Sequence, residues 1–177
     1  MIFNGSGSMQ GQESTNKSLD ELQAESFDRA GKATKASYPI ERALQARELE
    51  AFLSQRQYAV LSTTRPDGRP LAAVILFMFW RGAFWLPSTE GATRIRNLAS
   101  QPWASLVISH GEGSSHTAVV VEGPTVIHHD RREIDDLFDR GLMPIWRERV
   151  NKPHDWVAAL IELTPTKLLS YRAPRRS

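Results

Sequence analysis

The alternation of apolar runs and turn residues in the middle of the chain predicts three antiparallel strands. Tyr58 to Thr64 is apolar and β-branched, and Arg65-Pro66-Asp67-Gly68 follows it with turn chemistry, because proline presets φ and glycine tolerates positive φ. Leu71 to Trp80 then runs back as a buried strand, and a second short turn separates it from Ala83 to Pro87. The segment therefore predicts an antiparallel meander.

Later apolar runs predict the rest of a sheet. They are Trp103 to Ser109, His116 to Ile127 with Gly123-Pro124 as a bend or bulge, Val157 to Leu163 and Lys167 to Tyr171. Helical spacing predicts helices in Ile40 to Gln57, Ala92 to Ser100 and Arg131 to Arg140. We predict a mainly β fold with flanking helices, a six-stranded antiparallel split β-barrel, because closure removes exposed sheet edges.

The N-terminal segment differs in composition from the rest of the chain. Residues 1–18 are rich in Gly, Ser, Gln and Asn, and Leu19 to Lys35 fits either a marginal polar helix or a linker whose order depends on a partner subunit. We therefore divide the chain into a disordered or partner-dependent tail, 1–37, and a barrel domain, 38–177. At 177 residues and 41% hydrophobic composition, one buried core is expected.

A dense aromatic group accompanies the second and third strands: Phe77, Phe79, Trp80, Phe84 and Trp85. Alternate residues on a strand point to opposite faces, so one set is expected in the core. The other set would leave an apolar patch on a monomer, which favours burial at a dimer interface or under a flat cofactor ring.

The helix predicted at Ala92 to Ser100 is the main candidate for binding chemistry. The polar run Ser88-Thr89-Glu90-Gly91 leads into it, and Arg94 and Arg96 stand in its first turns. Free backbone N–H groups at a helix start, beside arginines, suit an anion such as a phosphate. The alternative is two solvated arginines on a helix surface.

Several motifs in order resemble the pyridoxamine phosphate oxidase-like split-barrel superfamily, which includes flavin- and deazaflavin-dependent oxidoreductases. They read LSTTRPDGRP, an apolar strand, an aromatic strand, TRIRNLASQPWASLVI and VEGPTVI, and the resemblance covers about Leu44 to Tyr171. It implies a homodimer with a flavin-type cofactor, FMN or coenzyme F420, across the subunit interface. It also implies hydride transfer to or from a small organic substrate, the cofactor carrying the hydride.

The resemblance also assigns site residues. It puts Arg94 where the family commonly has lysine, with Thr93 beside it on the phosphate, Pro87 and Ser88 near the ribityl chain, and Val74, Ile75 and Leu76 against the ring system. Arg96 is a further candidate for the phosphate. Ala92 stands where many relatives have a serine or a basic residue. No side chain stands out as an acid or base.

Two departures argue against pyridoxamine phosphate oxidation itself. True oxidases of this kind carry an arginine near the start and a lysine near the end of the strand that here has Ala73 and Met78. The remaining alternatives are an FMN- or F420-dependent oxidoreductase and a non-catalytic flavin, deazaflavin or haem binding protein. The fold alone does not distinguish the enzyme from the binding protein.

Charge and composition narrow the other function classes. A net charge of +2 is too small to predict nucleic acid as a partner, and the absence of cysteine excludes disulfides and thiolate chemistry. His128-His129-Asp130 has no third ligand at suitable spacing, so no metal is expected. The longest apolar run is ten residues, Leu71 to Trp80, against the roughly 20 that a membrane helix needs. We expect a cytoplasmic protein without membrane contact.

Overall fold

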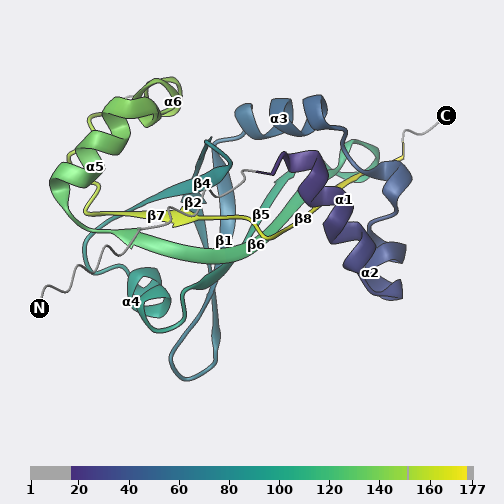
Figure 1. The fold of residues 1–177 in the computed structure, drawn as a ribbon, viewed down its shortest axis with the longest axis horizontal. Helices are drawn as coiled ribbons and strands as arrows, with labels where there is room; N and C mark the ends of the chain where they lie inside the picture. Colours follow the sequence, from purple (N-terminus) through teal and green to yellow (C-terminus); the bar gives the residue numbers. More distant parts are fainter. Residues whose placement is uncertain (1–16, 151, 175–177) are drawn as a thin grey trace, which may run out of the picture.

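The structure is a computed structural model that describes residues 17–150 and 152–174. It is an antiparallel β half-barrel with flanking helices (Figure 1), which confirms the predicted split-barrel fold class. The strands are β1 (Tyr58–Thr64), β2 (Pro70–Leu76), β3 (Met78–Trp80), β4 (Ala83–Ser88), β5 (Trp103–His110), β6 (Thr117–His128), β7 (Ala159–Leu163) and β8 (Lys167–Arg172). Their order is β2-β1-β5-β6-β7-β4-β3, and β8 pairs with β6.

The strand β6 joins the two halves of the barrel. Its first half, Thr117–Glu122, lies between β5 and β8, and its last residues, Thr125–His128, pair with β7. Gly123 lies between these two halves, at the bend that the sequence predicts. A Cβ atom at Gly123 would lie 2.0 Å from the carbonyl oxygen of Thr164, so the close approach of the two backbones requires glycine.

We expect the variant Gly123→Ala to lower the free energy of unfolding by about 1 to 3 kcal/mol, the usual scale of overpacking. Urea denaturation would measure the change. Gly31→Ala is the matched control, because a Cβ there would meet nothing within 4 Å. Equal stability of the two variants would contradict the close approach at Gly123.

The predicted strand Leu71 to Trp80 is wrong in two respects. It is broken at Phe77 into β2 and β3, and alternate residues of β2 are exposed rather than buried. Phe77 is fully buried, and its N–H donates to the carbonyl of Gln57 at 3.1 Å instead of to a sheet neighbour. The chain turns there from one half of the barrel to the other, so this one predicted segment forms two strands, and the sheet has eight strands instead of the six predicted.

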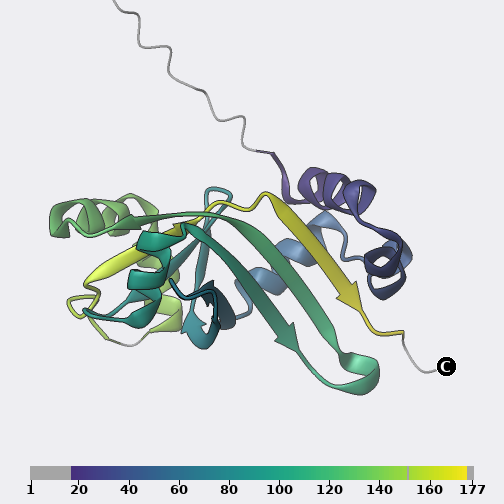
Figure 2. The same cartoon turned by 90° about the horizontal axis from the view of Figure 1, so that it is seen from below.

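Helices cover the two ends of the barrel (Figures 1 and 2). At one end lie α1 (Leu19–Arg29), α2 (Lys32–Ser37), the 3₁₀ turn η1 (Ile40–Arg42) and α3 (Ala46–Ser54). At the other lie α5 (Arg131–Leu137), the π-helical turn η3 (Phe138–Leu142) and α6 (Met143–Arg149). A further turn, η2 (Gly113–Ser115), connects β5 and β6, and α4 (Thr93–Ser100) follows β4. None of the described helices is long and apolar enough to span a membrane.

The described part of the N-terminal tail, 17–37, is helical and packs on β8, while residues 1–16 lie outside the described residues. A capping box of Ser18 and Glu21 begins α1. Ser26 Oγ accepts a hydrogen bond from the N–H of Leu168 at 2.9 Å, and Gln23 Nε2 donates to the carbonyl of Leu44 at 2.8 Å. The first bond satisfies a backbone group of β8, whose other side pairs with β6, and the second joins α1 to the segment before α3.

The aromatic group is buried more completely than the sequence predicts. Phe77 and Phe84 lie in the barrel core, as expected for one set. Trp85 is also buried, and Trp80 packs beside it in a second core formed with Ile134, Phe138, Leu142 and Trp146. The expectation of an exposed aromatic patch is therefore wrong, because helices from some 50 residues later in the chain cover it.

Candidate functional site

The end of β4 and the start of α4 bring four of the predicted site residues together: Ser88, Thr93, Arg94 and Arg96. Ser88 is fully buried, and Gly91, with a φ of 69°, turns the chain from β4 into α4. Arg94 folds back from the helix so that its Nε donates to Ser88 Oγ at 3.0 Å. The turn therefore holds a guanidinium group against the end of the strand.

Arg94 is a partly buried cation without a carboxylate partner among the described residues. Burial lowers the pKa of its guanidinium below the usual arginine value, and no neighbouring charge offsets that effect. A desolvated cation is costly unless an anion compensates it. The position is therefore suited to a ligand anion.

The start of α4 adds backbone donors to this cation. Its N-cap residue is Ala92, which has no side chain to accept a hydrogen bond from the first amides. The first N–H groups of a helix have no partner within the helix and carry a partial positive charge. Uncapped amides and an uncompensated guanidinium therefore occur in the same turn of the chain.

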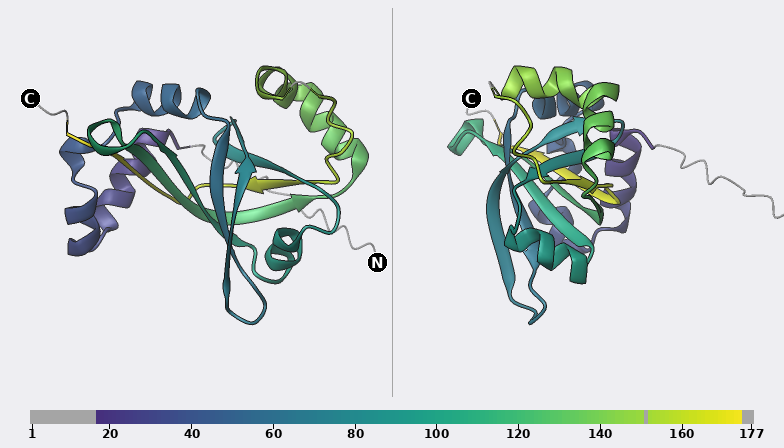
Figure 3. Two further views of the ribbon diagram at one scale, coloured as in Figure 1. Left: turned by 180° about the vertical axis from the view of Figure 1, so that it is seen from behind. Right: turned by 90° about the vertical axis from the view of Figure 1, so that its left-hand side faces the viewer.

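A hollow of about 200 Å³ lies between α4 and the turn that joins β1 to β2. Thr93 and Arg96 line it from the helix, and Arg65 lines it from the turn. The hairpin β1–β2 extends beside α4 (Figure 3), and Asn97 fixes the helix by donating to Thr63 Oγ1 at 2.9 Å. Arg65 and Arg96 therefore share this hollow with Asp67, whose carboxylate pairs with Arg69, while Arg94 is turned toward Ser88.

Sequence reasoning missed Arg65 because it assigned the whole run 65–68 to a hairpin turn. The turn exists: the N–H of Gly68 donates to the carbonyl of Arg65 at 2.9 Å, and Gly68 has a φ of 85°. Only the long-range contact between this turn and α4 shows that Arg65 lines a hollow together with Thr93 and Arg96.

The other predicted residues lie on β2 and at the end of β4, and they do not share one environment. Val74 faces outward and is 71% exposed, while Ile75 is buried in the barrel core. Leu76 is partly buried against the second core, and Pro87 is buried in β4. Of the three strand residues, Val74 is therefore the one most accessible to a ligand.

Val74 belongs to an apolar outer face of β2, β1 and β5. Val60 lies opposite Val74 on one side and opposite Val107 on the other, so all three side chains are on one face of the sheet. Tyr58 and Trp103 share this face by strand alternation. The exposed fractions are 57% for Tyr58, 37% for Val60, 71% for Val74 and 51% for Trp103. Large apolar side chains grouped in this way indicate an interaction surface.

Comparison with known proteins agrees with this fold. Residues 46–170 match the family model described as pyridoxamine 5'-phosphate oxidase. No curated protein matches the chain in sequence.

Solved structures share the architecture at low sequence identity. A conserved hypothetical protein from Mycobacterium tuberculosis superposes with a TM-score of 0.66 at 18% identity, covering 79% of this chain and 95% of its own. An FAD-binding protein from Mesorhizobium loti gives 0.58 at 18% identity, covering 75% and 97%. The haem storage protein HutZ from Vibrio cholerae gives 0.53 at 16% identity, covering 72% and 95%. At these identities the likeness shows the fold alone.

Proposed function

Because this chain belongs to the pyridoxamine 5'-phosphate oxidase family, we propose that it binds a flavin-type cofactor, FMN or coenzyme F420, and transfers hydride to or from a small organic substrate. The observation that carries the proposal is Arg94, a partly buried guanidinium without a carboxylate partner among the described residues, beside the uncapped start of α4. That donor set fits a phosphate group.

In this proposal each residue of the site has a distinct role. Arg94 and Thr93 bind the phosphate with the first amides of α4, and Arg96 and Arg65 supply further positive charge beside it. Ser88 orients the Arg94 guanidinium through their 3.0 Å hydrogen bond. Pro87 and Ser88 lie near the ribityl chain, Val74 and Leu76 face the ring system, and Ile75 supports that strand from the core. The cofactor, once bound, supplies the hydride chemistry.

We propose that the protein acts as a homodimer. The outer face formed by Tyr58, Val60, Val74 and Trp103 lies partly on β2, the strand proposed to contact the ring system. In a single copy of the chain these side chains are exposed to solvent. A second copy of the chain on this face would cover the apolar side chains and enclose the ring. The resemblance to a family of homodimers supports this occupant over an unrelated partner.

We expect Val74→Lys to convert the dimer into a monomer, because two lysines would be desolvated within an apolar interface. Sedimentation velocity would measure the mass of the particle. Ile40→Lys is the control, since Ile40 is an exposed apolar residue, 48% accessible, in the turn η1 rather than on this face. A Val74→Lys variant that sediments like the unchanged protein would argue against this interface.

The direct test of the cofactor is a titration of the purified protein with FMN and, separately, with F420, followed by fluorescence quenching. Saturable binding of one of them identifies the cofactor. If neither binds, the proposed function fails.

A second candidate function is storage or transport of a flavin, deazaflavin or haem without turnover. One protein of this fold, HutZ, is described as a haem storage protein. Turnover of the reduced cofactor with a panel of electron acceptors favours the enzyme. Tight binding without turnover favours the carrier, and a haem titration identifies that ligand by its Soret band.

A further inference from the structure

A second hollow, of about 490 Å³, lies between α6 and the residues after it in the chain. Its volume falls within the range of small-molecule sites. Its described lining combines positive charge with apolar surface and contains no carboxylate; the polar residues are Arg147, Lys152 and His154, and the apolar ones include Met143, Val150 and Pro153. None of these residues belongs to the α4 site.

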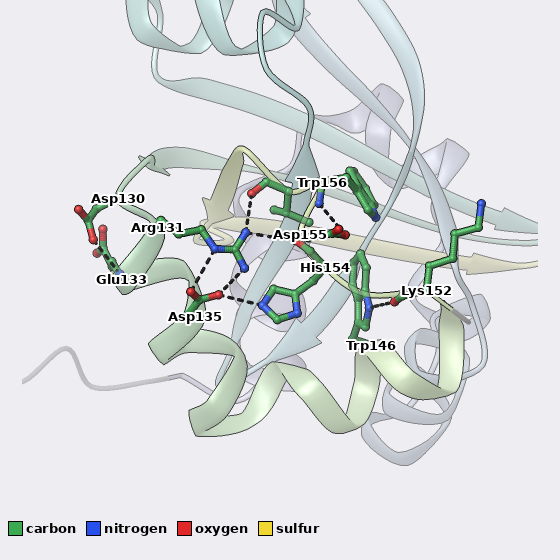
Figure 4. Close-up of polar contacts among 10 residues, drawn as sticks. Asp130, Arg131, Glu133, Asp135, Trp146, Lys152, His154, Asp155 and Trp156 are labelled. Carbon is green, nitrogen blue, oxygen red and sulfur yellow. Dashed lines mark hydrogen bonds and ion pairs between the residues drawn. The ribbon is translucent and has the colours of Figure 1, made fainter.

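His154 is held in one orientation by its neighbours (Figure 4). Its Nε2 lies 2.9 Å from Asp135 Oδ1, and its ring stacks on Phe138 with 4.1 Å between centroids and 22° between planes. Arg131 holds the same carboxylate through Nε and Nη2, with 3.1 Å between Nε and Asp135 Oδ2. Hydrogen bonds from Arg131 and His154 lower the pKa of Asp135 below the usual aspartate value.

This arrangement fixes which nitrogen of His154 is left for a ligand. An ionised carboxylate only accepts hydrogen bonds, so Nε2 carries the hydrogen that is donated to Asp135. In the neutral ring Nδ1 is then an acceptor, and it has no hydrogen-bond partner among the described residues. Figure 4 shows Nδ1 turned away from Asp135.

The wall of the hollow is also fixed before any ligand arrives. Trp146, which is almost fully buried, donates from Nε1 to the carbonyl of Lys152 at 2.8 Å. Arg131 Nη1 lies 3.4 Å from the carbonyl of His154. The segment carrying the cation and the imidazole is therefore anchored to α5 and α6, and a preformed site loses less entropy on binding.

We propose that this hollow binds a small aromatic carboxylate that also carries a hydroxyl or N–H donor. Arg147 and Lys152 pair with the carboxylate, the apolar lining contacts the ring, and His154 Nδ1 accepts the hydrogen bond from the donor group. The inference goes beyond the proposed function, because this site requires neither the flavin nor the α4 arginines.

The test uses the full chain without flavin and three probes in calorimetric titrations. 4-Hydroxybenzoate carries both recognised groups, benzoate lacks the hydroxyl, and 4-hydroxybenzyl alcohol lacks the carboxylate. We expect 4-hydroxybenzoate to bind tightest, with each missing group weakening binding roughly tenfold.

Two variants assign the contacts. Arg147→Gln combined with Lys152→Gln should weaken 4-hydroxybenzoate by roughly tenfold or more, since both positions are exposed and the fold is retained. His154→Phe keeps an aromatic ring against Phe138 and should abolish the preference for 4-hydroxybenzoate over benzoate. His110→Phe, at an exposed histidine on β5, is the control and should change nothing.

The proposal is overturned if none of the probes binds saturably, if the neutral alcohol binds as tightly as 4-hydroxybenzoate, or if the double glutamine variant binds like the unchanged chain. A thermal unfolding scan of each variant verifies its fold. Because no flavin is added, failure here leaves the cofactor titration unaffected, and failure of that titration leaves this result unaffected.

Discussion

Replacement of Arg149 by alanine is expected to lower the free energy of unfolding by about 3 kcal/mol, the scale of several lost hydrogen bonds from a charged donor. Arg149 Nη1 donates to the carbonyl of Phe77 at 2.6 Å, and Nη2 donates to the carbonyls of Leu53 and Ser54 at 3.1 and 2.9 Å. One side chain thus caps the end of α3 and satisfies the break between β2 and β3.

The cost is large because the partners are backbone carbonyls; that of Leu53 keeps the N–H of Arg56 as a second donor at 3.4 Å, so the loss falls mainly on the carbonyls of Phe77 and Ser54. Burial lowers the pKa of the Arg149 guanidinium below the usual arginine value, and the ring of Phe77 lies 5.3 Å from its Cζ. The side chain of Gln57 also donates to the carbonyl of Arg149, which ties α6 to the start of β1. Loss of Arg149 therefore loosens α3, β3 and α6 together.

Urea denaturation would measure this loss. Arg147→Ala is the matched control, because Arg147 is exposed on the same helix, and a surface change of this kind is usually within about 0.5 kcal/mol. Arg149→Lys should fall between the two, since lysine keeps the charge but not the planar set of donors. If Arg149→Ala were as stable as Arg147→Ala, the three carbonyls would not depend on this side chain.

Replacement of Arg94 by alanine is expected to weaken binding of FMN or F420 by about 2 kcal/mol, or roughly 30-fold, the scale of a charge-assisted hydrogen bond. The protein should remain folded, because Arg94 bonds only to Ser88 Oγ among the described residues. Removing a partly buried cation that lacks a counter-charge costs little stability, so the change should appear in affinity alone.

Fluorescence titration of both variants and the unchanged protein measures this effect. Arg94→Lys should retain part of the affinity, because the charge stays and the bidentate geometry is lost. Arg132→Ala, an exposed arginine on α5, is the control for a general loss of positive charge. Unchanged affinity in Arg94→Ala would remove this residue from the binding site.

Local chemistry predicted much of the barrel, and long-range contacts decided the rest. The Arg65 to Gly68 turn, the bend at Gly123 and the helix at α4 follow from glycine, proline and apolar spacing within a few residues. The break at Phe77 depends on Gln57 and Arg149, which are distant in the chain.

The difference between local chemistry and long-range contacts also explains which residues of the candidate site the sequence could predict. The sequence places Ser88, Thr93, Arg94 and Arg96 in one short segment, and the structure brings them together. Arg65 joins Thr93 and Arg96 only through the packing of a hairpin against α4. The contact between His154 and Asp135 likewise joins residues from either side of α6, where helical periodicity alone predicts no partner.

The shared strand β6 also determines the order in which this domain can be completed during synthesis. Its partner β5 precedes it, but β7 and β8 are the last two strands of the described chain. Until they emerge from the ribosome, one edge of a twelve-residue strand has unpaired backbone groups. The nascent domain therefore carries an aggregation-prone edge until β7 and β8 have been made, and α5, η3 and α6, which are made in that interval, are elements available to shield it.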